Sequence, residues 1–454
     1  MRIRLGRVSR RFRRISMWAI RYTEEVDFKM NFFGNIPIEW TVKVLAMCSR
    51  NLKRLKTHFL IDSSTPFECS LLISTTQWPS LRSVVLWGNS IENNCFNQFL
   101  ATCPNLRELV ITRSGNLVFD VRCEKLESVD INECRSSFIR ELTQNYPNLK
   151  KMHLMHMEGG AVKFSSPNLK ELVLNSLEHI MFDVKCEKIE HLELKHCGKS
   201  IVHKLVQSNP TLADLTVSFM MTLVDDQYLN DLLGVASMLR SFKLSSLHFL
   251  LPMFENLPNL QKMRFLRDLE LSDQRQITDR LFCVLATCCE LLERLALQAW
   301  RRSVKDEVTG RGIRALTKLV RLREFEFWRD MYKSNPPIDI GLRALAECGR
   351  LECVDLHGNT IERLTIAAFV RCCPMLTRLQ IFDISDMTTV KAALEMLREF
   401  KGSLRSNLWL RIDSSNPLIK TTWGSRAVAA AVGKINTSSR GRGIFVSTPD
   451  GFCF

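Results

Sequence analysis

The feature that most constrains the fold is a leucine spacing that repeats along the chain. From Leu266 the sequence follows L-x-x-L-x-L, which predicts a short strand with one apolar face. After Ile277, Leu281 and Leu285 lie on one face of a predicted helix, and the leucine spacing resumes at Leu292, about 26 residues after it began. Such a strand–turn–helix unit cannot bury its apolar face alone, so it has to stack on copies of itself.

Strands of this kind are predicted through most of the chain, mostly 20 to 30 residues apart. They start at Leu52, Leu81, Leu106, Leu126, Leu149, Leu169, Ile189, Leu212, Leu239, Leu260, Leu292, Leu322, Leu351 and Leu376. The longer intervals have room for a helix between strands. The 20-residue intervals that start at Leu106, Leu149 and Leu169 have room only for an extended segment or a tight turn.

A longer period supports this repetition. The block Pro104–Val110 returns as Pro167–Val173, and Phe119–Lys125 returns as Phe182–Lys188, each with an offset of 63 residues. A duplicated block of several repeats explains this offset.

The units resemble leucine-rich repeats of the cysteine-containing kind. The Ile277-Thr278-Asp279 sequence and the cysteine that ends the helix match that pattern, whereas the mid-repeat cysteine is missing. The resemblance implies an α/β solenoid, a leucine-rich-repeat horseshoe with parallel strands on the concave face and helices or extended segments on the convex face.

The N-terminus is basic, with eight arginines and no acid in the first 23 residues. Val8, Phe12 and Ile15 lie on one helical face of a segment that resembles the last helix of an F-box, so the chain is identified as similar to F-box/leucine-rich-repeat proteins. The resemblance implies that these three residues contact a Skp-type adaptor in a cullin complex. The upstream F-box helices are absent from the sequence. A basic helix that caps the repeats and a mitochondrial presequence are the alternatives.

Composition narrows the remaining function classes. The net charge is +15, yet residues 61–400 contain 41 basic and 42 acidic residues, so we expect no nucleic-acid partner. Cysteines at repeat-equivalent positions, including Cys48, Cys103, Cys134, Cys197, Cys288 and Cys348, are predicted to be small buried residues, which favours a reducing compartment, cytoplasm or nucleus. We expect no metal site, cofactor, membrane span or catalytic residue.

Residues between the strand leucines are predicted to face the concave surface and to bind a protein substrate. The candidates are Trp87, His153, His156, His191, Glu193, Phe219, Glu326, Trp328, Arg329, Asp355 and Phe382. The same pattern also assigns Lys243, Asp268, Glu270, His357 and Arg378 to this surface. The histidines could form a pH-sensitive contact or an ordinary polar surface.

The sequence divides into three predicted parts. Residues 1–36 are a partial F-box-like basic helix and connection, residues 37–412 are the repeat array, and residues 413–454 are a cap and loose tail. One junction is irregular, because Leu260 and Leu266 each open a strand pattern and one of the two must be a loop. Two functions fit this organisation: the substrate-recognition subunit of a Skp–cullin–F-box ubiquitin ligase, and a leucine-rich-repeat scaffold or inhibitor without a ligase.

Overall fold

The computed structural model describes the chain in segments that form two compact units, residues 1–212 (unit 1) and 213–454 (unit 2). The described residues are 18–29, 45–58, 77–87, 93–112, 120–133, 142–156, 161–175, 181–218, 226–245, 258–272, 277–298, 308–329, 337–358, 361–382, 409–413 and 444–445.

Unit 1 contains a parallel sheet in which strands pair in the order β1-β2-β3-β4-β5-β6-β8-β10. These strands are β1 (Glu25–Lys29), β2 (Arg54–His58), β3 (Ser83–Trp87), β4 (Glu108–Thr112), β5 (Ser128–Asn132), β6 (Lys151–Met155), β8 (Glu171–Asn175) and β10 (His191–Lys195). The other elements are α5 (Asn93–Ala101), β7 (Ala161–Ser165), β9 (Met181–Lys185) and α7 (Lys199–Gln207).

Unit 2 contains a second run of parallel strands, paired in chain order from β11 to β19. They are β11 (Asp214–Ser218), β12 (Ser241–Ser245), β13 (Asp268–Leu271), β14 (Arg294–Gln298), β15 (Glu324–Trp328), β16 (Cys353–His357), β17 (Arg378–Phe382), β18 (Trp409–Asp413) and β19 (Ile444–Phe445). Between them lie α8 (Asp226–Val235), η3 (Pro258–Lys262), α9 (Asp279–Cys288), α10 (Gly310–Ala315), η4 (Leu316–Lys318), α11 (Asp339–Glu347) and α12 (Arg363–Cys372).

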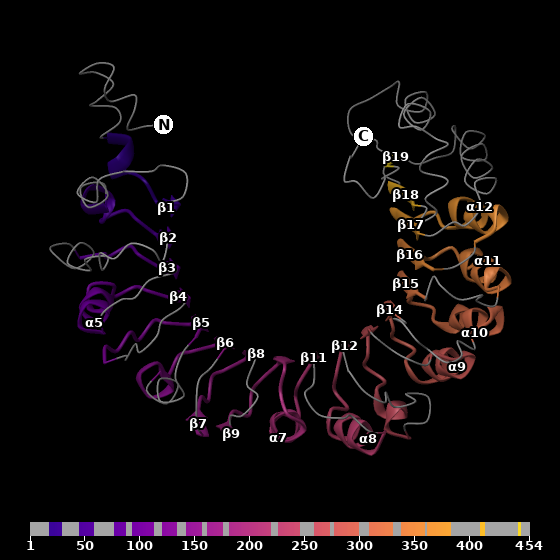
Figure 1. Ribbon diagram of the computed structural model, residues 1–454, viewed down its shortest axis with the longest axis horizontal. Helices are drawn as coiled ribbons and strands as arrows, with labels where there is room; N and C mark the ends of the chain where they lie inside the picture. The colour runs from indigo at the N-terminus through magenta and orange to yellow at the C-terminus, as the bar shows by residue number, and fades with distance from the viewer. Residues whose placement is uncertain are drawn as a thin grey trace. The chain divides into compact units, whose positions relative to one another are not determined.

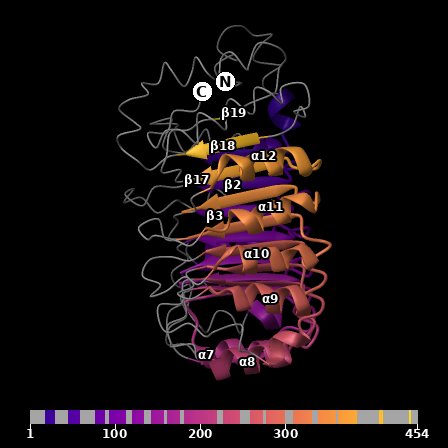
Figure 2. The same ribbon diagram turned by 90° about the vertical axis from the view of Figure 1, so that its right-hand side faces the viewer.

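The strand leucines form the core of each unit. In unit 2, Leu269, Leu295, Phe325, Val354 and Leu379 pair in register on neighbouring strands, and all five are 0% exposed. Within each unit the strands lie on one side and the helices on the other (Figure 1), and α9 to α12 stack as one layer (Figure 2). The predicted leucine-rich-repeat solenoid is therefore confirmed.

Two predictions about irregular repeats have definite outcomes. The short intervals that start at Leu149 and Leu169 contain extended segments, β7 and β9, which pair in parallel with each other. The prediction of a strand at Leu260 is wrong. Leu260 lies in the short 3-10 helix η3 and Met263 directly follows it, and both side chains are buried at this i, i+3 spacing. The strand opened by Leu266 forms as β13.

The duplicated Pro-Asn-Leu motif holds neighbouring repeats of unit 1 together. Asn105 Nδ2 donates to the carbonyl of Pro79 at 2.6 Å, and Asn168 Nδ2 donates to the carbonyl of Pro147 at 3.1 Å. Each amide thus satisfies a carbonyl of the preceding repeat. Both copies of the motif therefore make the same bond.

Aspartates play the corresponding role in the helices of unit 2. Asp279 of α9 accepts hydrogen bonds from the backbone N–H groups of Thr309 and Gly312 at the start of α10. Asp339 of α11 accepts from Glu362 N at 2.8 Å and Thr365 Oγ1 at 2.6 Å at the start of α12. A carboxylate stabilises the N-terminus of the next helix, because that end carries unpaired N–H groups and a positive dipole.

The repeat cysteines are mostly small buried residues, as predicted. Cys48, Cys103 and Cys197 are buried free thiols, and burial raises their pKa values, to about 12 for Cys103. At the end of α9 it is Cys289 that is buried and Cys288 that is half-buried, so the prediction chose the wrong cysteine of that pair. Cys348 is half-buried, and Cys134 lies outside the described residues.

Candidate functional site

The open face of unit 2 is the side of β11–β17 that the helices do not cover. Its side chains come from the first, third and fifth residues of each strand, because alternate residues of a strand point to opposite faces. The second and fourth residues are buried, as the patterns of β12 and β15 show. The register brings corresponding residues of neighbouring strands side by side, so charges that are 25 to 30 positions apart in sequence meet.

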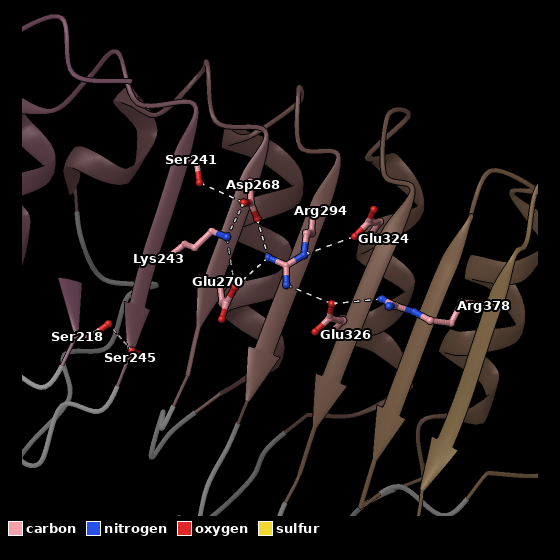
Figure 3. Close-up of polar contacts among 10 residues, drawn as sticks. All are labelled: Ser218, Ser241, Lys243, Ser245, Asp268, Glu270, Arg294, Glu324, Glu326 and Arg378. Carbon is pink, nitrogen blue, oxygen red and sulfur yellow. Dashed lines mark hydrogen bonds and ion pairs between the residues drawn. The ribbon is translucent and has the colours of Figure 1, made fainter. Parts of the chain in front are cut away.

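Arg294, the first residue of β14, lies at the centre of this face (Figure 3). Its Nη1 lies 3.0 Å from Asp268 Oδ1 and 3.0 Å from Glu270 Oε2, both on β13. Its Nη2 donates to Glu326 Oε1 at 3.2 Å, and its Nε lies 3.5 Å from Glu324 Oε2 on β15. Burial alone would lower the pKa of Arg294, but the hydrogen bonds and charges of these carboxylates raise it above its ordinary value.

Two more cations flank this cluster. Lys243 Nζ of β12 lies 3.4 Å from Asp268 Oδ2 and 3.8 Å from Glu270 Oε2. On the other side, Arg378 Nη2 of β17 lies 3.8 Å from Glu326 Oε1. The charges therefore alternate across the four neighbouring strands β12 to β15, and Arg378 approaches Glu326 from β17, two strands away. This network fixes the side chains before any partner binds.

Aromatic and acidic residues continue the face on β15 and β16. Trp328 and His357 are partners in the strand register, and their rings stack with centroids 3.9 Å apart. Asp355, two residues before His357, is only 6% exposed. Its Oδ1 lies 2.8 Å from His357 Nε2. Of the predicted binding residues, Glu326, Trp328 and Asp355 are therefore brought together.

Arg329 is separated from this group. It is 4% exposed, its Nη2 donates to the carbonyl of Val308 at 3.2 Å, and its guanidinium lies 5.7 Å from the centroid of the Phe327 ring. Its contacts hold the segment before α10 against β15.

The predicted residues of unit 1 lie on the equivalent face of that sheet. His153 Nε2 lies 3.0 Å from Glu171 Oε1, and His153 Nδ1 lies 3.8 Å from Asp130 Oδ2. His156 follows β6 with a φ of 49° and is exposed, and His191 is the exposed first residue of β10. Glu193 on β10 forms an ion pair with Lys195.

Several predicted residues fall outside the described part of the chain. Val8, Phe12, Ile15 and Phe219 are not described, nor are the side chains of Trp87 and Phe382 at the ends of β3 and β17.

Arg294 and Glu324 were missed by the sequence prediction. Each directly precedes the first buried residue of its strand, Leu295 or Phe325, so the leucine pattern places both residues before the start of the strand. The signal that could have identified them is the register, since Asp268 occupies the same position in β13 and was assigned to the face.

The raised pKa of His153 predicts a measurable titration. The carboxylate of Asp130 and, against the effect of burial, the hydrogen-bonded carboxylate of Glu171 raise its pKa above the ordinary value of about 6.5. The stabilisation from these contacts is therefore complete below the unfolded pKa and is lost as pH rises through the folded pKa. NMR titration of histidine-labelled protein should give a lower His153 pKa in Asp130→Asn and an unchanged one in Glu108→Gln. An Asp130→Asn variant that titrates like wild type would contradict this cause.

Stacked repeats with an uncovered, polar sheet face define a leucine-rich-repeat protein, a class whose members bind other proteins. Residues 17–172 match the family described as FBD-associated F-box protein At5g56370, LRR repeats. Among solved structures, the chain is similar to the LRR protein LIC12759 of Leptospira interrogans, at 14% identity and a TM-score of 0.40, covering 96% of this chain and 98% of that chain. No curated protein matches.

The described residues contain no group of three or more His, Cys, Asp or Glu residues arranged to hold a metal ion. Among the helices in this part of the chain, none has the length and apolar character that a membrane span requires.

Proposed function

We propose that this chain is the substrate-recognition subunit of a Skp–cullin–F-box ubiquitin ligase, without catalytic residues of its own, in the cytoplasm or nucleus. The observation that carries the proposal is the family match, which begins at residue 17, directly after the segment in which Val8, Phe12 and Ile15 resemble an F-box helix. In this arrangement the N-terminal segment that contains Val8, Phe12 and Ile15 binds the Skp-type adaptor, and the repeats bind a protein substrate.

The open faces supply the substrate-binding surface in this proposal. In unit 2, an ion-pair cluster around Arg294 lies beside the stacked rings of Trp328 and His357. Arginine and tryptophan are the side chains that most often anchor protein interfaces, surrounded by a polar rim. From unit 1, His153, His156, His191 and Glu193 are candidate contacts, together with Trp87, and Phe219 and Phe382 complete the set from unit 2.

A pull-down with the full-length chain tests the ligase association. Wild type and Phe265→Asp are expected to recover the Skp-type adaptor, whereas Phe12→Asp is expected to lose at least about 90% of it, because a charge in an apolar helix face opposes docking. Phe265 is a matched control, since it is 47% exposed and lies in unit 2.

The other outcomes discriminate between functions. If wild type recovers no adaptor, the ligase proposal fails and the scaffold or inhibitor without a ligase takes its place. Equal recovery by Phe12→Asp and wild type would refute the docking role of the N-terminal helix.

A further inference from the structure

Asp355, on the open face of unit 2, is buried without the hydrogen bonds that a buried structural carboxylate normally accepts. Asp355 is 6% exposed, and no Lys or Arg among the described residues forms an ion pair with it. Its Oδ1 accepts no hydrogen bond from a described residue, although His357 Nε2 lies 2.8 Å away, because that approach does not follow a hydrogen-bond direction. Burying a carboxylate in this way costs stability.

Asp339 shows what a satisfied buried aspartate of this protein looks like. It is 4% exposed, similar to Asp355, but its Oδ1 accepts hydrogen bonds from Glu362 N and Thr365 Oγ1 at the start of α12. Asp339 thus stabilises the fold, whereas Asp355 lacks such donors within the described part of the chain. Its Oδ1 is closed off from solvent beside His357, so a donor supplied by another molecule reaches the carboxylate at Oδ2.

The neighbours of Asp355 indicate what that donor is. Glu326, in register with it on β15, is 12% exposed. Its Oε1 accepts a hydrogen bond from Arg294 Nη2 at 3.2 Å, and its contact with Arg378 is long, at 3.8 Å. The stacked rings of Trp328 and His357 lie at the next residues along the same two strands. Carboxylates beside flat aromatic rings fit a guanidinium, which donates two parallel hydrogen bonds and stacks on aromatic faces.

The net charge of the face also favours a basic partner. The first, third and fifth residues of β12–β17 include five carboxylates and three cations. Figure 3 shows four of the carboxylates (Asp268, Glu270, Glu324, Glu326) and the three cations (Lys243, Arg294, Arg378), and Asp355 is the fifth carboxylate. An excess of acid attracts a basic segment and repels an acidic one.

We propose that the open face of β15 and β16 binds an arginine side chain of a partner protein, with its guanidinium on Asp355 and against the Trp328–His357 stack. This inference rests on the proposed function only in that the open face binds a protein; it needs no adaptor or ligase. It assigns the substrate a basic segment with at least one exposed arginine.

Fluorescence anisotropy with the purified full-length chain tests this site. The probes are a labelled Gly/Ser nonapeptide containing three arginines and the same peptide with lysine or with citrulline, which keeps the shape of arginine but lacks its charge. The arginine peptide is expected to bind about tenfold or more tightly than the citrulline peptide, and more tightly than the lysine peptide.

Two variants identify the residue responsible. Asp355→Asn should weaken binding of the arginine peptide about tenfold or more. The denaturation midpoint of this variant should stay the same or rise, because a costly buried charge is removed. Glu347→Gln removes the same charge from an exposed residue of α11 and should bind like wild type.

Three results would overturn the inference. The first is that the lysine or the citrulline peptide binds as tightly as the arginine peptide. The second is that Asp355→Asn binds the arginine peptide as tightly as wild type. The third is that the denaturation midpoint of Asp355→Asn falls as far as that of Asp339→Asn. The adaptor is absent from this assay. If the arginine peptide binds here but the pull-down recovers no adaptor, the ligase proposal fails and the arginine site still stands.

Discussion

Replacing Gly341 with alanine is expected to destabilise unit 2 by about 2–3 kcal/mol, because the added methyl group has no space. A Cβ at this position would lie 2.3 Å from the carbonyl oxygen of Gly310 and 2.8 Å from Ile313 Cβ. The carbonyl carbon of Gly310 would lie 2.9 Å away, so two of the three nearest atoms belong to the backbone of α10 and cannot move aside as a side chain can. The helices would have to separate, and the strands beneath them would separate too.

Denaturant unfolding followed by far-UV circular dichroism measures this effect. Gly198→Ala is the control, because a Cβ there meets no atom within 4 Å and φ is −74°, which alanine adopts freely. We expect it to cost less than about 1 kcal/mol. An equal loss in both variants would show that the effect is general to glycine and does not come from the α10–α11 contact.

Most of the fold could be predicted because its signals are local. Alternating burial in strands and the Leu281–Leu285 helix face each depend on a few neighbouring residues, and both were confirmed. The strand predicted at Leu260 failed because the i, i+3 spacing of Leu260 and Met263 fits a helical turn as well as a strand pattern. Likewise, periodicity alone did not identify which residue of the Cys288–Cys289 pair is buried.

The candidate site was less predictable because it depends on contacts between repeats. The pattern of alternation assigned Asp268 and Glu326 to the open face, but it could not show that Arg294 joins them, since those contacts cross strands from three repeats. The unsatisfied Oδ1 of Asp355 is likewise a property of its neighbours in three dimensions. Sequence shows which residues share a face, whereas the register determines which charges are paired.

The pairing around Arg294 predicts that Arg294→Ala destabilises unit 2 by about 2–3 kcal/mol at neutral pH. Asp268, Glu270, Glu324 and Glu326 would then repel one another without the guanidinium that now contacts all four. Lys243 and Arg378 approach them only at 3.4 Å or more, so they compensate in part. Denaturant unfolding of the variant and of wild type measures the difference.

The pH dependence distinguishes this repulsion from lost packing. In the variant, the four carboxylates repel one another while they are ionised, so the penalty is present at neutral pH and is relieved as acid neutralises them. The stability gap from wild type should therefore narrow below about pH 5. Arg323→Ala is the matched control, because the Arg323 side chain is 61% exposed and, among the described residues, forms an ion pair with Glu352 alone. It should change stability by less than about 0.5 kcal/mol. A gap for Arg294→Ala that stays constant with pH would attribute the loss to packing of the arginine stem.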